Sequence, residues 1–220
     1  MKLIIYGNGK IAKVVYEYVK NEFDIICFTV PSKLITATDM KGLPIYPFEK
    51  IANLFEPASH EMIIAVGYHQ MNTIRDQRYL KLKAMGYKFI NYIHPSVHRH
   101  DDLIIGEGNI ILDNVSIQPG VRIGNNNFIW SNSVIAHECS IENSCWIASG
   151  TVIGGSTEIR SGCFLGINAS IGHNIIVNNN NFLGANTLIT KSTDINAVYL
   201  MNDSQKIRLD SQRFLKFSGI

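Results

Sequence analysis

The sequence predicts two domains of different fold class and a short tail. Residues 1–92 are expected to form an α/β, Rossmann-like domain, residues 93–196 a left-handed parallel β-helix, and residues 197–220 a C-terminal cap. Three observations support this division. Short apolar runs alternate with helical patterns in the first 90 residues, a six-residue repeat fills most of the second half, and the repeat stops after Ala197. A chain of 220 residues is long enough for two modest domains.

The six-residue repeat is the most informative feature of the chain. It begins at Ile105, and every sixth residue from there to Ile195 is aliphatic. A helix has a period of 3.6 residues and a single strand a period of 2, so neither explains it. A coil built from three short strands does, because each six-residue block turns one side chain inward. Residues 18 apart should therefore stack in columns, one strand spacing of ~4.8 Å apart.

Within each block the fourth residue after the aliphatic one is small. Three of the four cysteines, Cys139, Cys145 and Cys163, occupy this position. Other blocks place Val, Ser, Thr or Ala there, so we interpret these cysteines as small buried fillers. No C-x-x-C spacing indicates a metal or redox pair.

The first 90 residues alternate strands with helices. Strands are expected at 3–7, 24–30, 43–46, 61–67 and 87–92, and helices at 10–20, 47–55 and 71–85. This order predicts a parallel sheet covered by helices.

Charge and composition exclude some partners. The net charge is +2, and the sequence contains no cluster of consecutive Lys and Arg residues that could bind a phosphate backbone. No nucleic-acid partner is therefore expected. The five-residue apolar run near the N-terminus is too short for a signal peptide, and no segment is typical of a membrane span. We expect no membrane partner and a cytoplasmic location.

His137 and Glu138 are the best candidates for chemistry in the coil. By the repeat, Gly155 lies one coil above His137, and His173 two coils above it. A neutral imidazole is a competent base near neutral pH, and a neighbouring carboxylate can orient it. A backbone N–H without a side chain can stabilise an oxyanion. Together these groups fit acyl transfer from a thioester, whereas the alternative is a plain hydrogen-bonded corner.

A glycine-rich turn, Gly7-Asn8-Gly9-Lys10, follows the first strand and opens the first helix. It approximates the dinucleotide-binding fingerprint, in which backbone N–H groups face a phosphate. The acidic residue expected at the end of the second strand is absent, since that strand ends in Thr29-Val30. The turn therefore predicts a nucleotide-linked ligand rather than a full NAD site, the alternative being an ordinary strand–helix turn.

The remaining histidines do not indicate a metal. His94, His98 and His100 lie at the domain junction, where a structural role is favoured. A zinc-dependent solenoid hydratase would need three converging imidazoles, commonly including an H-x-x-x-x-H pair, and this pair is absent. We expect no metal.

Five segments together resemble a known family. They are YGNGKIAKVV (6–15), IAVG (64–67), GYKFINYIHPSV (86–97), VIAHECSI (134–141) and GCFLGINASIG (162–172). The chain resembles the sugar O-acyltransferase family named for the sialic acid O-acetyltransferases. That family includes N-acyltransferases of nucleotide-linked 4-amino-4,6-dideoxy sugars. The segment GYHQMNTIRDQRYLKLKAMGYK (67–88) looks closer to a branch that acts on dTDP-linked sugars.

The resemblance implies a homotrimer that uses acetyl-CoA, or another short acyl-CoA, and works in polysaccharide biosynthesis. It implies that His137 is the base, Glu138 its partner and Gly155 the backbone donor. The site residues expected to contact the ligands fall into two groups. Those expected to contact the coenzyme are Gly155, Gly166, Ile167, Asn168, His173 and Lys191, and those expected to contact the sugar nucleotide are Gly7, Asn8, Gly9, Lys10 and Trp130.

Three other functions stay open from the sequence. The acceptor could be a sugar hydroxyl instead of an amine, because the same base and donor serve both. The coil could be a binding module without catalysis, or a metal-dependent hydratase.

Overall fold

The computed structural model describes residues 2–219. The N-terminal part contains a six-stranded sheet with the strand order β3-β4-β2-β1-β5-β6. All neighbouring strands are parallel except β3 and β4. The strands are β1 (Lys2–Tyr6), β2 (Asp24–Val30), β3 (Asp39–Met40), β4 (Leu43–Pro47), β5 (His60–Ile64) and β6 (Lys88–Phe89).

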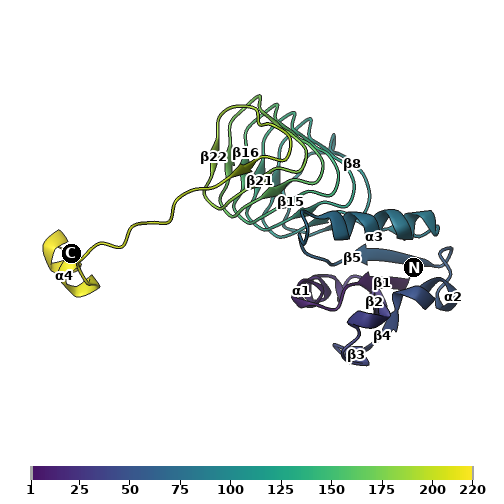
Figure 1. Ribbon diagram of the computed structural model, residues 1–220. Coiled ribbons are helices and arrows are strands. Elements are labelled where there is room, and N and C mark those ends of the chain that lie inside the picture. The colour runs from purple at the N-terminus through teal and green to yellow at the C-terminus, as the bar shows by residue number, and fades with distance from the viewer. Residues whose placement is uncertain (1, 220) are drawn as a thin grey trace.

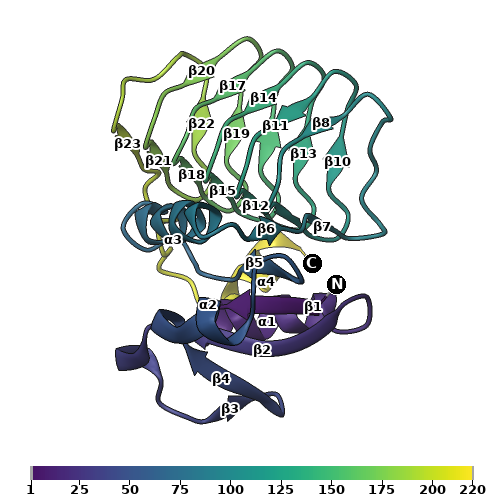
Figure 2. The ribbon, with the colours of Figure 1, turned by 90° about the vertical axis from the view of Figure 1, so that its right-hand side faces the viewer.

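Helices cover both faces of this sheet (Figure 2). They are α1 (Lys10–Val19), α2 (Ile51–Leu54) and α3 (Thr73–Ala84), with single 3-10 turns at Ser32–Leu34 and Phe48–Lys50. α1 packs its apolar residues against one face of the sheet, and α2 and α3 pack theirs against the other. The expected strands and helices are confirmed, except that β3 was not expected and that 87–92 is divided between β6 and the first strand of the coil.

The second half is a parallel β-helix with three faces (Figure 1). Each strand pairs with the strand 18 residues further on over most of the coil, as the repeat predicts. Face A contains β7 (Tyr92–Ile93), β9 (Ile110–Ile111), β12 (Phe128–Ile129), β15 (Trp146–Ile147), β18 (Phe164–Leu165), β21 (Phe182–Leu183) and β23 (Val198–Tyr199). Face B contains β10 (Ser116–Ile117), β13 (Val134–Ile135), β16 (Val152–Ile153), β19 (Ser170–Ile171) and β22 (Leu188–Ile189). Face C contains β8 (Ile104–Ile105), β11 (Arg122–Ile123), β14 (Ser140–Ile141), β17 (Glu158–Ile159) and β20 (Ile176–Val177).

The aliphatic repeat fills the inside of the coil. Its members from Ile111 to Ile189 form one buried cluster, together with the small residues Cys139, Cys145 and Cys163. Burial of these cysteines confirms their interpretation as fillers. The left-handed backbone needed at each corner is supplied mostly by Asn and Gly, as at Asn126 with φ 58°.

The prediction that the repeat extends to Ile195 is wrong. β23 pairs with β21 sixteen residues earlier instead of eighteen, and Ile195 is 63% exposed. The shortened loop is hydrogen-bonded to the preceding turn, where the amide of Asn181 donates to the Asp194 carbonyl at 2.7 Å. The regular repeat therefore ends at Ile189.

The tail does not cap the coil as expected. Residues 200–219 are all exposed, and Figure 1 shows them leaving the coil as an arm that ends in α4 (Ser211–Ser218). The physical reason lies in the shortened last coil. It already buries Ile189 and Leu183, the last members of the inner apolar layer, without help from the tail. The predicted tail, 197–220, also includes one residue outside the described range, as does the predicted domain 1–92.

The outer side of face A joins the two domains. Phe128, Trp146 and Phe164 point outward from this face and share one apolar cluster with β1 and α1. Figure 2 shows the N-terminal sheet and its helices beside face A. No helix within residues 2–219 is long and apolar enough to cross a membrane.

Candidate active site

His137 lies on the corner between faces B and C, which we call the His corner (turns 136–139, 154–157 and 172–175). Strand register carries Val134 onto Val152 and Val152 onto Ser170, so the turns that follow these strands are stacked. His137, Gly155 and His173 thus occupy equivalent places in three successive turns. The column expected from the sequence is present.

The ring of His137 lies directly against Gly155. A Cβ atom placed on Gly155 would lie 2.5 Å from both Cε1 and Nε2 of His137, so any larger residue would displace the ring. Gly155 is buried, and its N–H donates no hydrogen bond to any acceptor within residues 2–219. The next amide, that of Ser156, is occupied, since it donates to the His137 carbonyl at 2.8 Å. The corner therefore places an imidazole beside an unused backbone donor.

Glu138 is close to the imidazole but is not hydrogen-bonded to it. The distance from Nδ1 of His137 to Oε2 of Glu138 is 4.0 Å, and the two side chains are 60% and 72% exposed. The same carboxylate oxygen accepts a hydrogen bond from the Ser156 hydroxyl at 3.2 Å. Glu138 can thus act on the imidazole through its charge, and a small rotation would bring it into contact.

A cleft of about 600 Å³ lies at the carboxyl ends of β1, β2 and β5. All four residues of the glycine-rich turn, Gly7 to Lys10, line it, and α1 begins there. A helix N-terminus and free backbone N–H groups favour an anion. The predicted substrate turn thus borders a real cavity.

The turn needs glycine at position 7 for two reasons. Gly7 has φ +134°, and a Cβ atom there would lie 2.6 Å from the carbonyl oxygen of Ala65 on the neighbouring strand. The close approach of these two backbones forms the floor of the cleft. Asn8 closes one side, because its amide donates to the Leu34 carbonyl at 2.9 Å.

The sequence did not identify the other polar residues of the cleft. Lys33, His69 and Arg78 also line it. With Lys10, the side chains of Lys33 and Arg78 make three cationic groups around the cavity. Lys33 follows β2 and Arg78 belongs to α3, and neither stands in a motif. Only the fold brings them next to the glycine turn.

The residues expected to contact the coenzyme do not all lie together. Gly166, Ile167 and Asn168 form part of the corner between faces A and B, on the other side of face B from His137. Ile167 is 56% exposed there. His173 and the exposed Lys191 follow strands of face B, on the His corner.

Trp130 is not part of the cleft lining. Its ring stacks on Phe128, with centroids 4.9 Å apart, at the edge of the aromatic surface between face A and the N-terminal domain. Its indole Nε1 is buried and has no acceptor within the described residues. The predicted contact between Trp130 and a substrate stays a prediction.

The cleft and the His corner of one chain lie far apart. The coil has a triangular cross-section, the N-terminal domain packs on face A, and the His corner is the vertex opposite that face (Figure 2). One chain therefore does not bring the glycine turn to His137.

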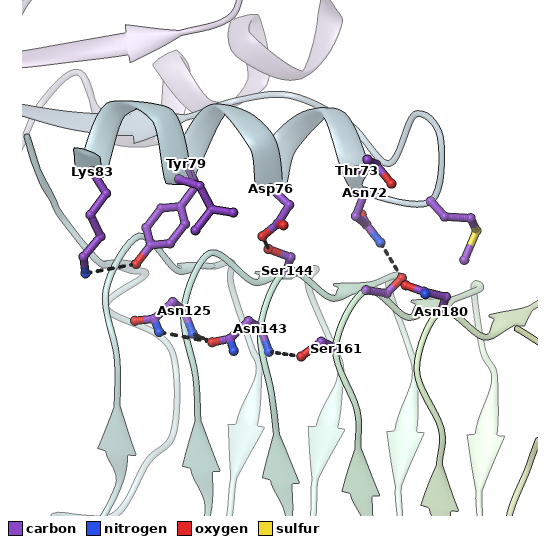
Figure 3. Close-up of a pocket in the computed structure, with 13 residues that line it drawn as sticks. Asn72, Thr73, Asp76, Tyr79, Lys83, Asn125, Asn143, Ser144, Ser161 and Asn180 are labelled. Atoms are coloured by element: carbon purple, nitrogen blue, oxygen red, sulfur yellow. Dashed lines mark hydrogen bonds between the residues drawn. The ribbon is translucent and has the colours of Figure 1, made fainter. Parts of the chain in front are cut away.

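A second cleft, of about 500 Å³, lies between α3 and the corner that joins faces C and A (Figure 3). We call this the Asn corner (turns 124–127, 142–145, 160–163 and 178–181). The cleft is lined by amides and hydroxyls, among them Asn143, Ser161 and Asn180. None of the predicted site residues lies in it. Nor do residues 2–219 place three or more His, Cys, Asp or Glu side chains where they could hold a metal ion.

Comparison with known proteins supports the architecture. A family model described as the GMPPB C-terminal domain matches residues 90–197, which is the coil. A search of curated proteins finds no match.

Several solved structures have the same two-part fold. The acetyltransferase domain of PglB from Neisseria gonorrhoeae FA1090 is 24% identical, with a TM-score of 0.81 over 90% of this chain and 95% of that one. Perosamine N-acetyltransferase from Caulobacter crescentus, in complex with CoA and GDP-perosamine, is 20% identical with a TM-score of 0.81 over 90% and 92%. WeeI from Acinetobacter baumannii AYE is 17% identical with a TM-score of 0.59 over 90% and 96%. At these identities the likeness establishes the fold.

Proposed function

We propose that this protein is an acyl-CoA-dependent N-acyltransferase, with acetyl-CoA as the donor and the 4-amine of a nucleotide-linked 4-amino-4,6-dideoxy sugar as the acceptor. The observation that carries this proposal is the packing of the His137 ring on Gly155, whose N–H is unused. A base and an oxyanion donor side by side are the two groups that acyl transfer needs.

In the proposed reaction the sugar amine attacks the thioester carbonyl carbon, and a C–N bond forms. His137 takes the proton that the nitrogen loses. The Gly155 N–H donates to the oxyanion of the tetrahedral intermediate. When the C–S bond breaks, the imidazolium returns the proton to the sulfur, so that CoA leaves as the thiol. The Glu138 carboxylate, 4.0 Å from the ring, would stabilise the imidazolium.

Acetyl-CoA as the donor is supported by the ligands bound in two structural relatives. The PglB domain has been solved with acetyl coenzyme A, and the perosamine enzyme with CoA. We propose that the coenzyme lies along the coil, against the bare backbone of Gly166 and the neighbouring Ile167 and Asn168. A Cβ atom on Gly166 would lie 2.6 Å from the Ala185 amide nitrogen, so a larger residue does not fit there. His173 and Lys191 would contact the same coenzyme from the His corner.

The N-terminal cleft would hold the nucleotide of the acceptor. The N-terminal sheet has five parallel strands. Numbered by their order in the chain, they are arranged 3-2-1-4-5, which is the order of Rossmann-like sheets and supports a nucleotide in this cleft. Lys10, Lys33 and Arg78 suit a diphosphate. The base would lie at the end lined by Val30, Pro31 and Leu34. Among residues 2–219 no carboxylate lines this cleft, which favours thymine over guanine and supports a dTDP-linked sugar. Trp130 would contact the sugar.

Because the cleft and the His corner of one chain are far apart, we propose that the active site forms between copies. In a homotrimer of left-handed coils, the sugar held by one subunit would reach the histidine of a neighbour. This arrangement, and membership of the sugar O-acyltransferase family, agree with the resemblance found in the sequence. The domain division at residues 92 and 196 and the cytoplasmic location belong to the same proposal.

The test is mass spectrometry of products from a panel of dTDP-, UDP- and GDP-linked 4-amino sugars incubated with acetyl-CoA. We expect acetylation of the dTDP-linked amine and no product from the matching sugar with a hydroxyl at that position. Acetylation of the hydroxyl sugar alone would replace the proposal by O-acetylation. No product with any sugar, together with no thermal shift by CoA, would favour a binding module; ligand at about 100 times its Kd should stabilise by about 2.7 kcal/mol.

A further inference from the structure

Residues of α3 line both clefts of the molecule. Ile74 and Arg78 line the N-terminal cleft, while Asp76 and Tyr79 line the cleft on the coil side (Figure 3). A change in the position of this helix would therefore move the nucleotide cleft relative to the coil.

Arg75 is the most deeply buried charged residue of this helix. It is 1% exposed, and burial lowers the pKa of its guanidinium to about 10, so it stays charged near neutral pH. Within residues 2–219 no carboxylate forms an ion pair with it. A buried charge without an acid partner is costly unless its hydrogen bonds are made.

Oxygen acceptors bind both terminal nitrogens of the guanidinium, while its Nε has no partner within residues 2–219. One arm of the guanidinium donates to the Asn126 carbonyl. The other donates to the carbonyls of Ser144 at 2.9 Å and Cys145 at 3.1 Å, and to the side-chain oxygen of Asn72 at 3.0 Å. The planar fork of Arg thus bridges two successive turns of the Asn corner.

Asn72 extends the contact to a third turn. Its amide nitrogen donates to the carbonyls of Gly162 at 3.1 Å and Cys163 at 3.2 Å. Asn126, Ser144 and Gly162 are the left-handed residues of three stacked turns, with φ 58°, 57° and 74°. Their carbonyls accept no hydrogen bond from the backbone of the coil in the part of the chain described here. Arg75 and Asn72 therefore satisfy three corner carbonyls in a row.

We propose that Arg75 is a positioning residue, which locks α3 and the nucleotide cleft to the Asn corner of the coil. Lysine cannot replace it fully, because a single ammonium does not present two parallel arms to two turns. In the proposed assembly, the lock sets where a sugar bound in this cleft lies relative to the histidine of the neighbouring subunit. A misplacement of about 1 Å can lower the rate of a positioned reaction roughly 10²-fold.

The experiment compares Arg75→Met and Arg75→Lys with Lys83→Met in the full-length protein. Lys83 pairs with Glu107 across the same interface but is 53% exposed, so it is a matched control. For Arg75→Met we expect faster amide hydrogen exchange in α3 and in residues 124–127 and 142–145. We expect kcat to fall by roughly 10–10², while the Kd of the sugar nucleotide changes less than about threefold. Arg75→Lys should recover part of both effects, and Lys83→Met should show neither.

The kinetic effect rests on the proposed function, whereas the exchange effect does not. If wild-type protein transfers no acyl group but Arg75→Met still loosens α3, the proposed function fails and the lock stands. If Arg75→Met exchanges and turns over like wild type, the lock is overturned. Should Arg75→Met not fold, Arg75→Lys decides: wild-type exchange and kcat in that variant would overturn a role for the two-armed fork.

Discussion

The His corner and the Asn corner are built from the same local backbone, yet they are used in opposite ways. Each turn of both corners has a residue in the left-handed region, such as Glu138 with φ 57° and Ser144 with φ 57°. At the Asn corner α3 packs on the turns, and Arg75 and Asn72 bind carbonyls in three of the four. At the His corner the Gly155 N–H is unused and His137 is 60% exposed. The repeat therefore gives the turns of both corners the same backbone. The residues that pack on a turn decide whether it stabilises the fold or stays accessible to a substrate.

The largest effect is expected at the His corner, from His137→Ala. Loss of the proposed general base should lower kcat by roughly 10²–10⁴. The side chain is exposed, so the melting temperature should change little. Initial rates of acetyl transfer, with circular dichroism as the check on folding, measure both. A rate near that of wild type would remove His137 from the chemistry.

Gly155→Ala tests the same corner while leaving the imidazole chemically unchanged, because it acts only on the position of the ring. The new methyl would lie 2.5 Å from the ring, which must swing away from the N–H. Because the ring is the far end of an exposed side chain, we expect turnover to fall about 10²-fold with little loss of stability. Gly172→Ala is the control, since its nearest contact would be 3.4 Å, to the Ile189 carbonyl oxygen. Equal rates for the two variants would argue against a precise role for Gly155.

At the Asn corner the expected effect is on stability. Asn72→Gly removes the two hydrogen bonds to the carbonyls of Gly162 and Cys163 and the side-chain oxygen that accepts from Arg75, while keeping the left-handed φ of 64° accessible. We expect a loss of about 1–3 kcal/mol in the free energy of unfolding. Asn180→Gly is the matched control, because its φ is 56° and its side chain makes no hydrogen bond within residues 2–219. Urea denaturation compares the two, and equal losses would mean that the α3 contacts add nothing.

The smallest effect concerns pH and Glu107, which contacts α3. Burial would raise the pKa of this carboxyl, but hydrogen bonds from Lys83 and Tyr79 outweigh it, and the pKa lies below its usual 4.5. Its contribution to stability is therefore present above pH 4.5 and lost as the pH falls through the lowered folded pKa. Glu107→Gln should cost less than about 1 kcal/mol at pH 7 and nothing at the acid end. Thermal unfolding across this range measures it, and a loss that grows as the pH falls would contradict it.

The sequence predicted the coil well because its period is geometric. Eighteen-residue columns placed His137 against Gly155, and the same period put Ile111 to Ile189 inside the coil. It failed where packing across elements decides the outcome. A periodic pattern does not show that the last coil is two residues shorter. It also does not show that Lys33 and Arg78 lie beside the glycine turn, or that Arg75 binds the Asn corner.

The most direct test of acyl transfer at the His corner is a crystal structure with acetyl-CoA. The deciding distance is that from the thioester carbonyl oxygen to the Gly155 nitrogen. We expect the oxygen within about 3.5 Å of this nitrogen, close enough to reach 2.7–3.1 Å as the oxyanion forms, and beside the His137 ring. A thioester bound at the Asn corner, or on any face where it touches neither group, would contradict it.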